Sequence, residues 1–159
     1  MGGLSIFDNV AGRPLMERVD ANGKIWVKAY AHSSLTAKAP YGCYISYNGY
    51  RTGSLASVDT EASDSVHFHM PRWKIGVGRT AASTGDLVWM QVGGVASFTI
   101  GTATSLALGE FVEISGDSIV LGVATSSVPD YATIAVCYTA SSSTSVELLL
   151  LNKLVIGRE

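Results

Sequence analysis

The chain has little charge. Only 15% of its 159 residues are charged, while 47% are hydrophobic and the mean hydropathy is +0.28. An average globular domain carries about 25% charged residues, so a monomer of this composition has few polar side chains with which to cover its surface. Large exposed apolar patches usually mark interaction sites. The composition therefore predicts that apolar surface is buried between subunits.

Positive charge is missing from almost half of the chain. No Lys or Arg lies between residues 80 and 152, where the only charged residues are Asp86, Glu110, Glu113, Asp117, Asp130 and Glu147. A nucleic-acid surface needs clustered cations that neutralise phosphates. We therefore expect no nucleic-acid partner.

Long apolar runs and cysteine patterns are also absent. The longest apolar run, 146–151, has the length of a strand and is far from the ~20 residues of a membrane span. The start of the chain has Asp8 and no basic segment before its apolar residues, so we expect neither a signal peptide nor a membrane partner.

The two cysteines, Cys43 and Cys137, lie far apart in the sequence and form no CxxC motif. They are expected to be small buried side chains in a protein made in the cytoplasm, with a disulfide or a metal role as the alternatives.

Short apolar runs bounded by Gly, Ser, Asn or Asp dominate what is there. About nine strands are expected at a spacing of about ten residues, which is typical of an all-β sandwich or barrel. The expected strands are 24–31, 41–48, 65–70, 87–92, 96–100, 110–114, 118–124, 133–139 and 146–151. The fold class is thus an antiparallel β-sandwich or jelly roll, or a tulip-like barrel. The best helical candidate is the short segment 13–20, in which Pro14 is suited to the first turn of a helix.

The N-terminal segment is expected to be an extended arm, residues 1–18, followed by a single β domain, residues 19–159. The arm has glycines and isolated apolar residues but no turn motif that ties it to the first clear strand. Termini of this kind order by docking on a partner. An ordinary edge strand of the same domain is the alternative for this segment. The candidate contacts with neighbouring subunits or a shell are Leu4, Ile6, Phe7, Arg13 and Arg18.

The segment GDLVWMQVGG, residues 85–94, predicts a rigid apolar strand. The Gly93–Gly94 pair is expected to turn the chain into a hairpin with residues 96–100. Alternation places Trp89 and Gln91 on one face and Met90 and Val92 on the other, so both faces of the strand are largely apolar. We expect Trp89 to be a core residue.

Catalytic patterns are not found. The string GVGRTA at 76–81 resembles a loose dinucleotide-binding motif, but it runs into a turn and not into a helix. Glu110 and Glu113 point to opposite faces of a strand, which prevents shared acid–base chemistry. The chain is therefore expected not to be an enzyme and to need no cofactor.

Two other clusters leave alternatives open. His67 and His69 lie on one face of an expected strand, but a zinc site needs three or four ligands, so only a site shared between subunits is open to them. Tyrosines recur every three residues at 41, 44, 47 and 50. Tyr44, Tyr47 and Tyr50 are taken as candidates for an interface or the core, with a glycan platform as the alternative.

A longer stretch, residues 75–115, resembles small structural proteins of tailed-phage heads, particularly of phages of cyanobacteria and marine bacteria. The residues that carry the resemblance are Gly78, Ala81, Gly85, Val88, Trp89, Gln91, Gly93, Gly109, Glu110 and Val112. The segment IVLGVATSSVPDYATIAVCY, residues 119–138, is similar to the end of such proteins. Together the similarity extends over residues 75–139.

The resemblance implies a decoration or cement protein on the exterior of the virion. Such a protein binds, usually as a homotrimer, over junctions of the major capsid protein and stabilises the head. The alternative is another β-structured virion part, such as a head fibre, a tail component or a receptor-binding knob with glycan contact.

Overall fold

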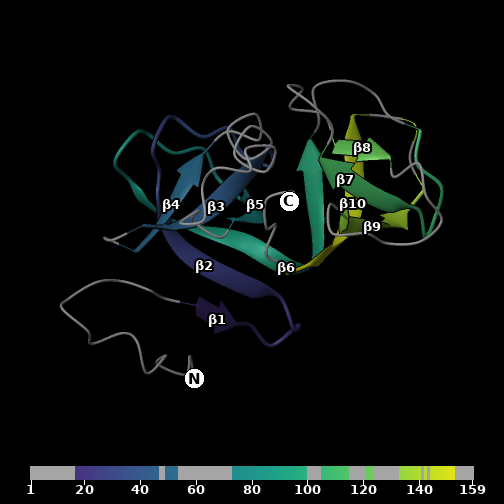
Figure 1. Ribbon diagram of the computed structural model, residues 1–159, viewed down its shortest axis with the longest axis horizontal. Coiled ribbons are helices and arrows are strands. Elements are labelled where there is room, and N and C mark those ends of the chain that lie inside the picture. Colours follow the sequence, from purple (N-terminus) through teal and green to yellow (C-terminus); the bar gives the residue numbers. More distant parts are fainter. Residues whose placement is uncertain are drawn as a thin grey trace, which may run out of the picture.

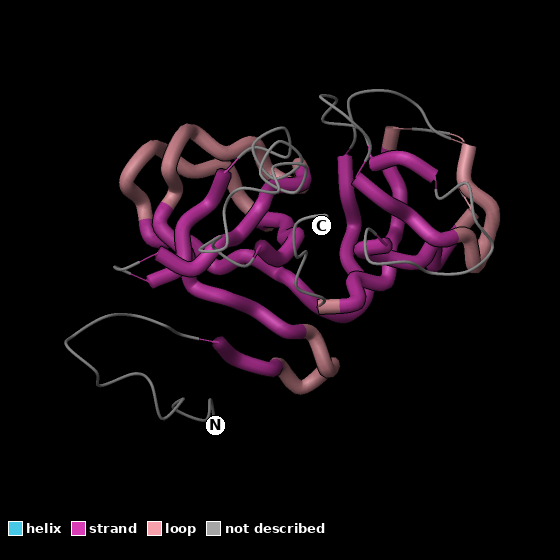
Figure 2. Tube along the Cα trace, in the orientation of Figure 1, coloured by secondary structure: helices cyan, strands magenta, loops and turns pink. Residues whose placement is uncertain are grey.

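The computed structural model describes residues 17–46, 49–53, 73–99, 105–114, 121–123, 133–140, 142 and 144–152. This part of the chain is all β-structure and contains no helix, as Figure 2 shows, so the all-β prediction is confirmed. The expected strand 65–70 lies outside the described residues, as do Leu4, Ile6, Phe7, Arg13, Tyr47, His67 and His69.

The described residues form ten strands that hydrogen-bond into one sheet. In chain order the strands are β1 (Glu17–Val19), β2 (Ile25–Tyr30), β3 (Pro40–Ser46), β4 (Gly49–Gly53), β5 (Trp73–Gly78), β6 (Leu87–Thr99), β7 (Phe111–Ile114), β8 (Leu121–Val123), β9 (Thr133–Thr139) and β10 (Ser145–Leu151).

The first half of the chain closes into a barrel. Strands β2, β4, β3, β5 and β6 follow one another around it, and the pairing of β6 with β2 completes the ring. The β2–β4 pair is parallel, whereas the other pairs of the ring are antiparallel. The short strand β1 lies outside the ring and pairs with β2.

The second half is a sheet in the order β6–β10–β9–β7–β8. Strand β6 belongs to both halves, because residues 87–93 pair with β2 and residues 93–99 pair with β10. In Figure 1 it runs along the barrel and then turns into the second group of strands. We call the barrel the first unit and the sheet from residue 93 onward the second unit.

The two units have the same strand order and register. In the first unit Pro40 pairs with Val77, and Val77 pairs with Gln91. In the second unit Phe111 pairs with Val136, and Val136 pairs with Leu149. The match continues along the next strand pair, where Lys28 opposes Trp89 and Ser97 opposes Glu147. The chain therefore contains a structural repeat in which β6 ends one copy and begins the other.

The same turn precedes three strands of this repeat. Ala39 N donates to Thr36 O, Asp86 N to Ser83 O, and Glu110 N to Ala107 O. Each turn has one residue with positive φ, respectively Lys38, Gly85 and Gly109. A side-chain oxygen accepts the first amide of each turn, from Tyr41, Asp86 or Glu110. These bonds satisfy the backbone where the chain changes direction.

Alternating burial divides the hydrophobic core into two clusters. The barrel interior holds Val27, Ala29, Ala31, Leu35, Cys43, Tyr50, Met90 and Val92. The larger cluster fills the second unit, with Phe98, Val112 and Leu148 fully buried, and it also includes Ile75 and Val77 from β5. Side chains of β5 thus help to fill the second unit.

The predicted hairpin at Gly93–Gly94 is wrong, because β6 passes through both glycines as one strand of 13 residues. Gly94 has φ +79° at the point where β6 leaves β2 for β10, and a Cβ on Gly93 would lie 2.9 Å from Ile25 Cδ1. The glycines serve a bend and a close approach, not a reversal. Gly23, with φ +74°, lies in the turn between β1 and β2.

Two further expectations differ from the structure. The helical candidate 13–20 is wrong for residues 17–19, which form β1. These residues include Arg18 and the end of the expected arm, so the chain is already part of the sheet at residue 17. A sandwich, jelly roll or tulip-like barrel remains a prediction, since the described strands show a closed barrel that continues into a sheet.

Candidate functional site

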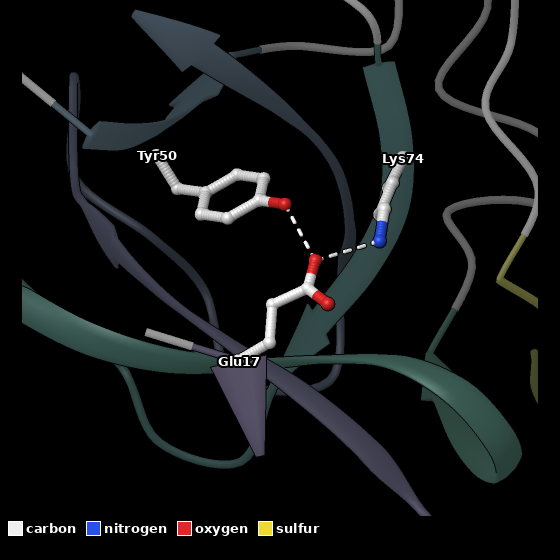
Figure 3. A network of polar contacts seen from close by, with 3 residues as sticks. All are labelled: Glu17, Tyr50 and Lys74. Carbon is white, nitrogen blue, oxygen red and sulfur yellow. Dashed lines mark hydrogen bonds and ion pairs between the residues drawn. The ribbon is translucent and has the colours of Figure 1, made fainter. Parts of the chain in front are cut away.

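Strand β1 is held against the barrel by three polar side chains (Figure 3). Glu17 Oε1 accepts hydrogen bonds from Lys74 Nζ at 2.8 Å and from the Tyr50 hydroxyl at 2.5 Å. Lys74 and Tyr50 come from β5 and β4 and are buried. A buried ammonium needs a partner, and Glu17 supplies it from outside the ring.

The electrostatics of this cluster follow from burial and pairing. Burial alone would raise the pKa of Glu17, but the hydrogen bonds from Lys74 and Tyr50 and the charge of Lys74 leave that pKa lowered. Burial, together with the Glu17 carboxylate, raises the pKa of Tyr50. At neutral pH the cluster therefore contains an ionised Glu17 carboxylate and a neutral Tyr50 phenol.

Three cations lie against two indoles on the outer face of β1, β2 and β6, and one of the cations, Arg79, comes from the residue after β5. The Arg18 guanidinium carbon lies 4.2 Å from the centroid of the Trp89 ring and 5.8 Å from that of Trp26. Arg79 lies 4.7 Å from Trp26, and Lys28 lies 5.7 Å from Trp89. We call these five side chains the cation–indole face.

The cation–indole face changes the interpretation of Trp89 and Arg18. Trp26 is the buried tryptophan, with 3% of its surface exposed and its Nε1 donating to Asp20 Oδ2 at 3.1 Å. Trp89 was expected in the core but is only half-buried on the outer face, under Arg18. Arg18 stacks on indoles of its own chain, and its expected contact with neighbouring subunits or a shell stays a prediction.

An apolar row crosses the outer face of the second unit. Val95, Leu149, Val136 and Phe111 are successive cross-strand partners on β6, β10, β9 and β7. All four are half-buried or exposed, and Leu149 has 38% of its surface exposed. Leu151, at 40%, lies beside the row on β10. We call the four residues the apolar row.

The equivalent row of the first unit is covered. Trp26, Gln91, Val77 and Pro40 occupy the matching positions, and all four are buried. Val77 packs into the larger core cluster, and Gln91 Nε2 donates to the carbonyls of Gly93 and Val95 at 3.1 and 2.8 Å. Only the second copy of this surface is left open by the described residues.

The tyrosine candidates are mostly inside the protein. Tyr50 is 5% exposed and bonded to Glu17, and Tyr44 is partly buried against the larger core cluster. Tyr41 is half-buried, and its hydroxyl accepts a hydrogen bond from Thr36 N at 2.8 Å. The rings of Tyr41, Tyr44 and Tyr50 thus do not form an open platform for sugars.

Both cysteines are free and buried. Burial raises the pKa of the Cys43 thiol to about 12, although the charge of Lys74 opposes this rise, so neither a thiolate nor a metal ligand is favoured there. Among the described residues, no group of three His, Cys, Asp or Glu could hold a metal ion. In the same part of the chain, no helix has the length and apolarity to cross a membrane.

Neither surface was expected from the sequence. The run of four leucines on β10 and the two-faced apolar character of β6 were signals for the apolar row, since a strand that is apolar on both faces needs cover on both. The cation–indole face carries no such signal. Its members are spread over residues 18–89, and only the sheet brings them together.

No protein-family model matches the chain, and no curated protein matches it either. Among solved structures, the N base of head fiber gp8.5 of bacteriophage phi29 is similar, with 12% sequence identity and a TM-score of 0.49. The alignment covers 82% of this chain and 97% of that one. A similarity of this size supports no conclusion about function.

Proposed function

We propose that the protein is a structural component of a phage virion. It decorates the exterior of the capsid as a homotrimer and stabilises the head by binding over junctions of the major capsid protein. The resemblance of residues 75–139 to small phage-head proteins supports the proposal. The proposed role requires no enzymatic activity and no cofactor.

The observation that carries the proposal is the apolar row. A surface that is buried in the first unit is open in the second, although the two units share one register. Exposed apolar surface of this kind is typical of a protein that completes its burial by assembly. The low charge of the chain agrees with this, because subunit interfaces are depleted in charged residues.

The rigid turns also suit a structural role. Each of the three repeated turns is closed by one backbone hydrogen bond and by one hydrogen bond from a backbone amide to a side-chain oxygen. The strand connections are therefore fixed by backbone and side-chain bonds together. Such connections resist local opening better than loops without internal bonds. A protein that must withstand pressure from packaged DNA needs this resistance.

Co-sedimentation tests the capsid part of the proposal. Empty capsids of the phage that encodes this chain, assembled without it, are mixed with the purified protein and pelleted. We expect saturable binding and capsids that open at a higher temperature. Absence of binding at micromolar concentrations would contradict the decoration role.

A deletion tests how the protein attaches. Removal of residues 2–16 takes away the proposed anchors Leu4, Ile6, Phe7 and Arg13 but keeps β1 with its Glu17 contact. We expect a folded oligomer that no longer pellets with capsids. Unchanged capsid binding would show that these residues are not the attachment.

The alternative is a head fibre, a tail component or a receptor-binding knob. Among the described tyrosines, the buried Tyr50 does not favour glycan contact. Thermal stabilisation by soluble glycans, together with failure to bind capsids, would favour this alternative over decoration.

A further inference from the structure

The three cations of the cation–indole face have donors to spare. A guanidinium that stacks on an indole through its flat side keeps its N–H groups at the edge, where they match a carboxylate. Among the described residues, none of Arg18, Lys28 and Arg79 forms an ion pair, since the only described salt bridge joins Lys74 to Glu17. Asp20 is the nearby acid, and it is bonded to Trp26 and to two backbone amides.

The matching place on the second unit has the opposite character. Where the first unit pairs Lys28 with Trp89, the second pairs Ser97 with Glu147. Glu147 is exposed, and Leu149 of the apolar row follows it on the same face of β10. One chain thus presents a basic aromatic face on its first unit and an acidic apolar face on its second unit.

Contacts between like faces are unfavourable. Two cation–indole faces brought together would oppose six positive charges, and two Glu147 faces would oppose carboxylates. A contact between unlike faces instead pairs Glu147 with the spare donors of Lys28 and of the two guanidiniums, and it covers Leu149 with indole and alkyl surface. Charge complementarity therefore favours a second copy of this chain as the occupant.

We propose that copies of the protein associate head to tail. The cation–indole face of one copy docks on the face of the next copy that carries Glu147 and the apolar row. Such a heterologous contact leaves one free face at each end until the ring closes, and three copies close the proposed trimer. The inference rests on the self-association in the proposed function but not on the capsid.

Charge reversal tests the contact. We expect Glu147→Arg and Lys28→Glu each to weaken self-association at least about tenfold, because each sets like charges against one another. The double variant Lys28→Glu/Glu147→Arg restores the pair in reversed order and is expected to recover the oligomer. Native mass spectrometry and sedimentation velocity without capsids measure the association, and circular dichroism checks the fold.

Matched controls separate this contact from general charge effects. Lys38→Glu makes the same charge change at an exposed turn residue that belongs to neither face, and it is expected to leave the oligomer intact. Arg18→Glu, with Arg18→Lys as its conservative partner, repeats the test from β1. Raising the salt concentration is expected to weaken the wild-type oligomer, because the pairs lie at the rim of the contact.

Three outcomes would overturn the proposal. The first is a wild-type monomer at micromolar concentration. The second is a folded Glu147→Arg variant with unchanged mass. The third is loss of association in both single variants without recovery in the double variant. If the single variants keep their oligomer but lose capsid binding, the capsid and not a second copy occupies the face.

Discussion

Glu17 lies on an exposed strand of three residues, yet two donors from inside the barrel converge on one of its oxygens. The contact explains how so short a strand holds its place, since three backbone partners alone give little stability. Its neighbour Arg18 points to the other side, as alternation requires, and meets the indoles there. One strand therefore links the barrel interior to the outer face.

Replacing Glu17 by Gln is expected to lower the free energy of unfolding at pH 7 by about 1–3 kcal/mol, since a charged hydrogen bond is lost and Lys74 stays buried. Because the Glu17 side chain is 41% exposed, solvent screens its charge, and we expect a loss in the lower part of that range. Urea unfolding measures the change. Tyr50→Phe, which keeps the ion pair, should cost less.

The same cluster predicts a pH dependence. The pKa of Glu17 is lower in the folded protein than in the unfolded chain, so its contribution is fully present above the unfolded value and is lost as the pH falls through the folded value. The wild type should therefore lose stability on acidification more steeply than Glu17→Gln. Parallel curves of unfolding free energy against pH would show that the carboxylate is not held as described.

The two tryptophans of the outer face are expected to contribute different amounts to the free energy of unfolding. Trp26→Ala should destabilise the fold by about 3–5 kcal/mol, the range for a buried aromatic side chain. Trp89→Ala removes a half-buried ring and its cation contacts and should cost clearly less, about 1–2 kcal/mol. Chemical denaturation of both variants measures the order, and equal losses would mean that Trp89 belongs to the core.

At the scale of elements, β6 depends on its two glycines. Gly94 has φ +79°, and a Cβ there would lie 3.2 Å from Lys24 Cα. Gly85 has φ +90° but no atom within 4 Å of such a Cβ. Gly85→Ala thus reports backbone strain alone, about 1–2 kcal/mol, and Gly94→Ala should cost more because crowding is added. Thermal melting of both variants tests this order.

Several strands were predictable from the sequence, but β1, β4 and β5 were not expected, and the connection at Gly93–Gly94 was predicted wrongly. Alternation placed β2, β7, β9 and β10 within one or two residues, because each buries one face against a core. The Gly93–Gly94 pair was taken as a hairpin turn, since dipeptides of this kind favour turns in the absence of tertiary partners. Only the close packing of Ile25 against Gly93 shows that the chain continues as one bent strand there and does not reverse.

The repeat was also missed, although GDLV at 85–88 and GEFV at 109–112 open two of its strands. Turn chemistry is local and leaves a trace in the sequence. Register is a property of paired strands, so the matching of Val77 with Val136 becomes visible only in the sheet. The cation–indole face and the apolar row are harder still to predict from the sequence, because their residues come from strands far apart in the chain.

At the scale of the whole molecule, the sharing of β6 has a consequence for folding. Neither unit possesses a complete set of strands without residues 87–99, so the chain has no point at which it can be cut into two autonomous halves. Most strand pairs also join segments that are far apart in the sequence, such as β2 with β6 and β3 with β5. Such topologies fold slowly and in an all-or-none manner. Calorimetry should therefore record one endotherm whose van't Hoff and calorimetric enthalpies agree. Amide hydrogen exchange should be slowed to the same degree at both ends of β6. A substitution that destabilises one unit is therefore expected to destabilise the other as well.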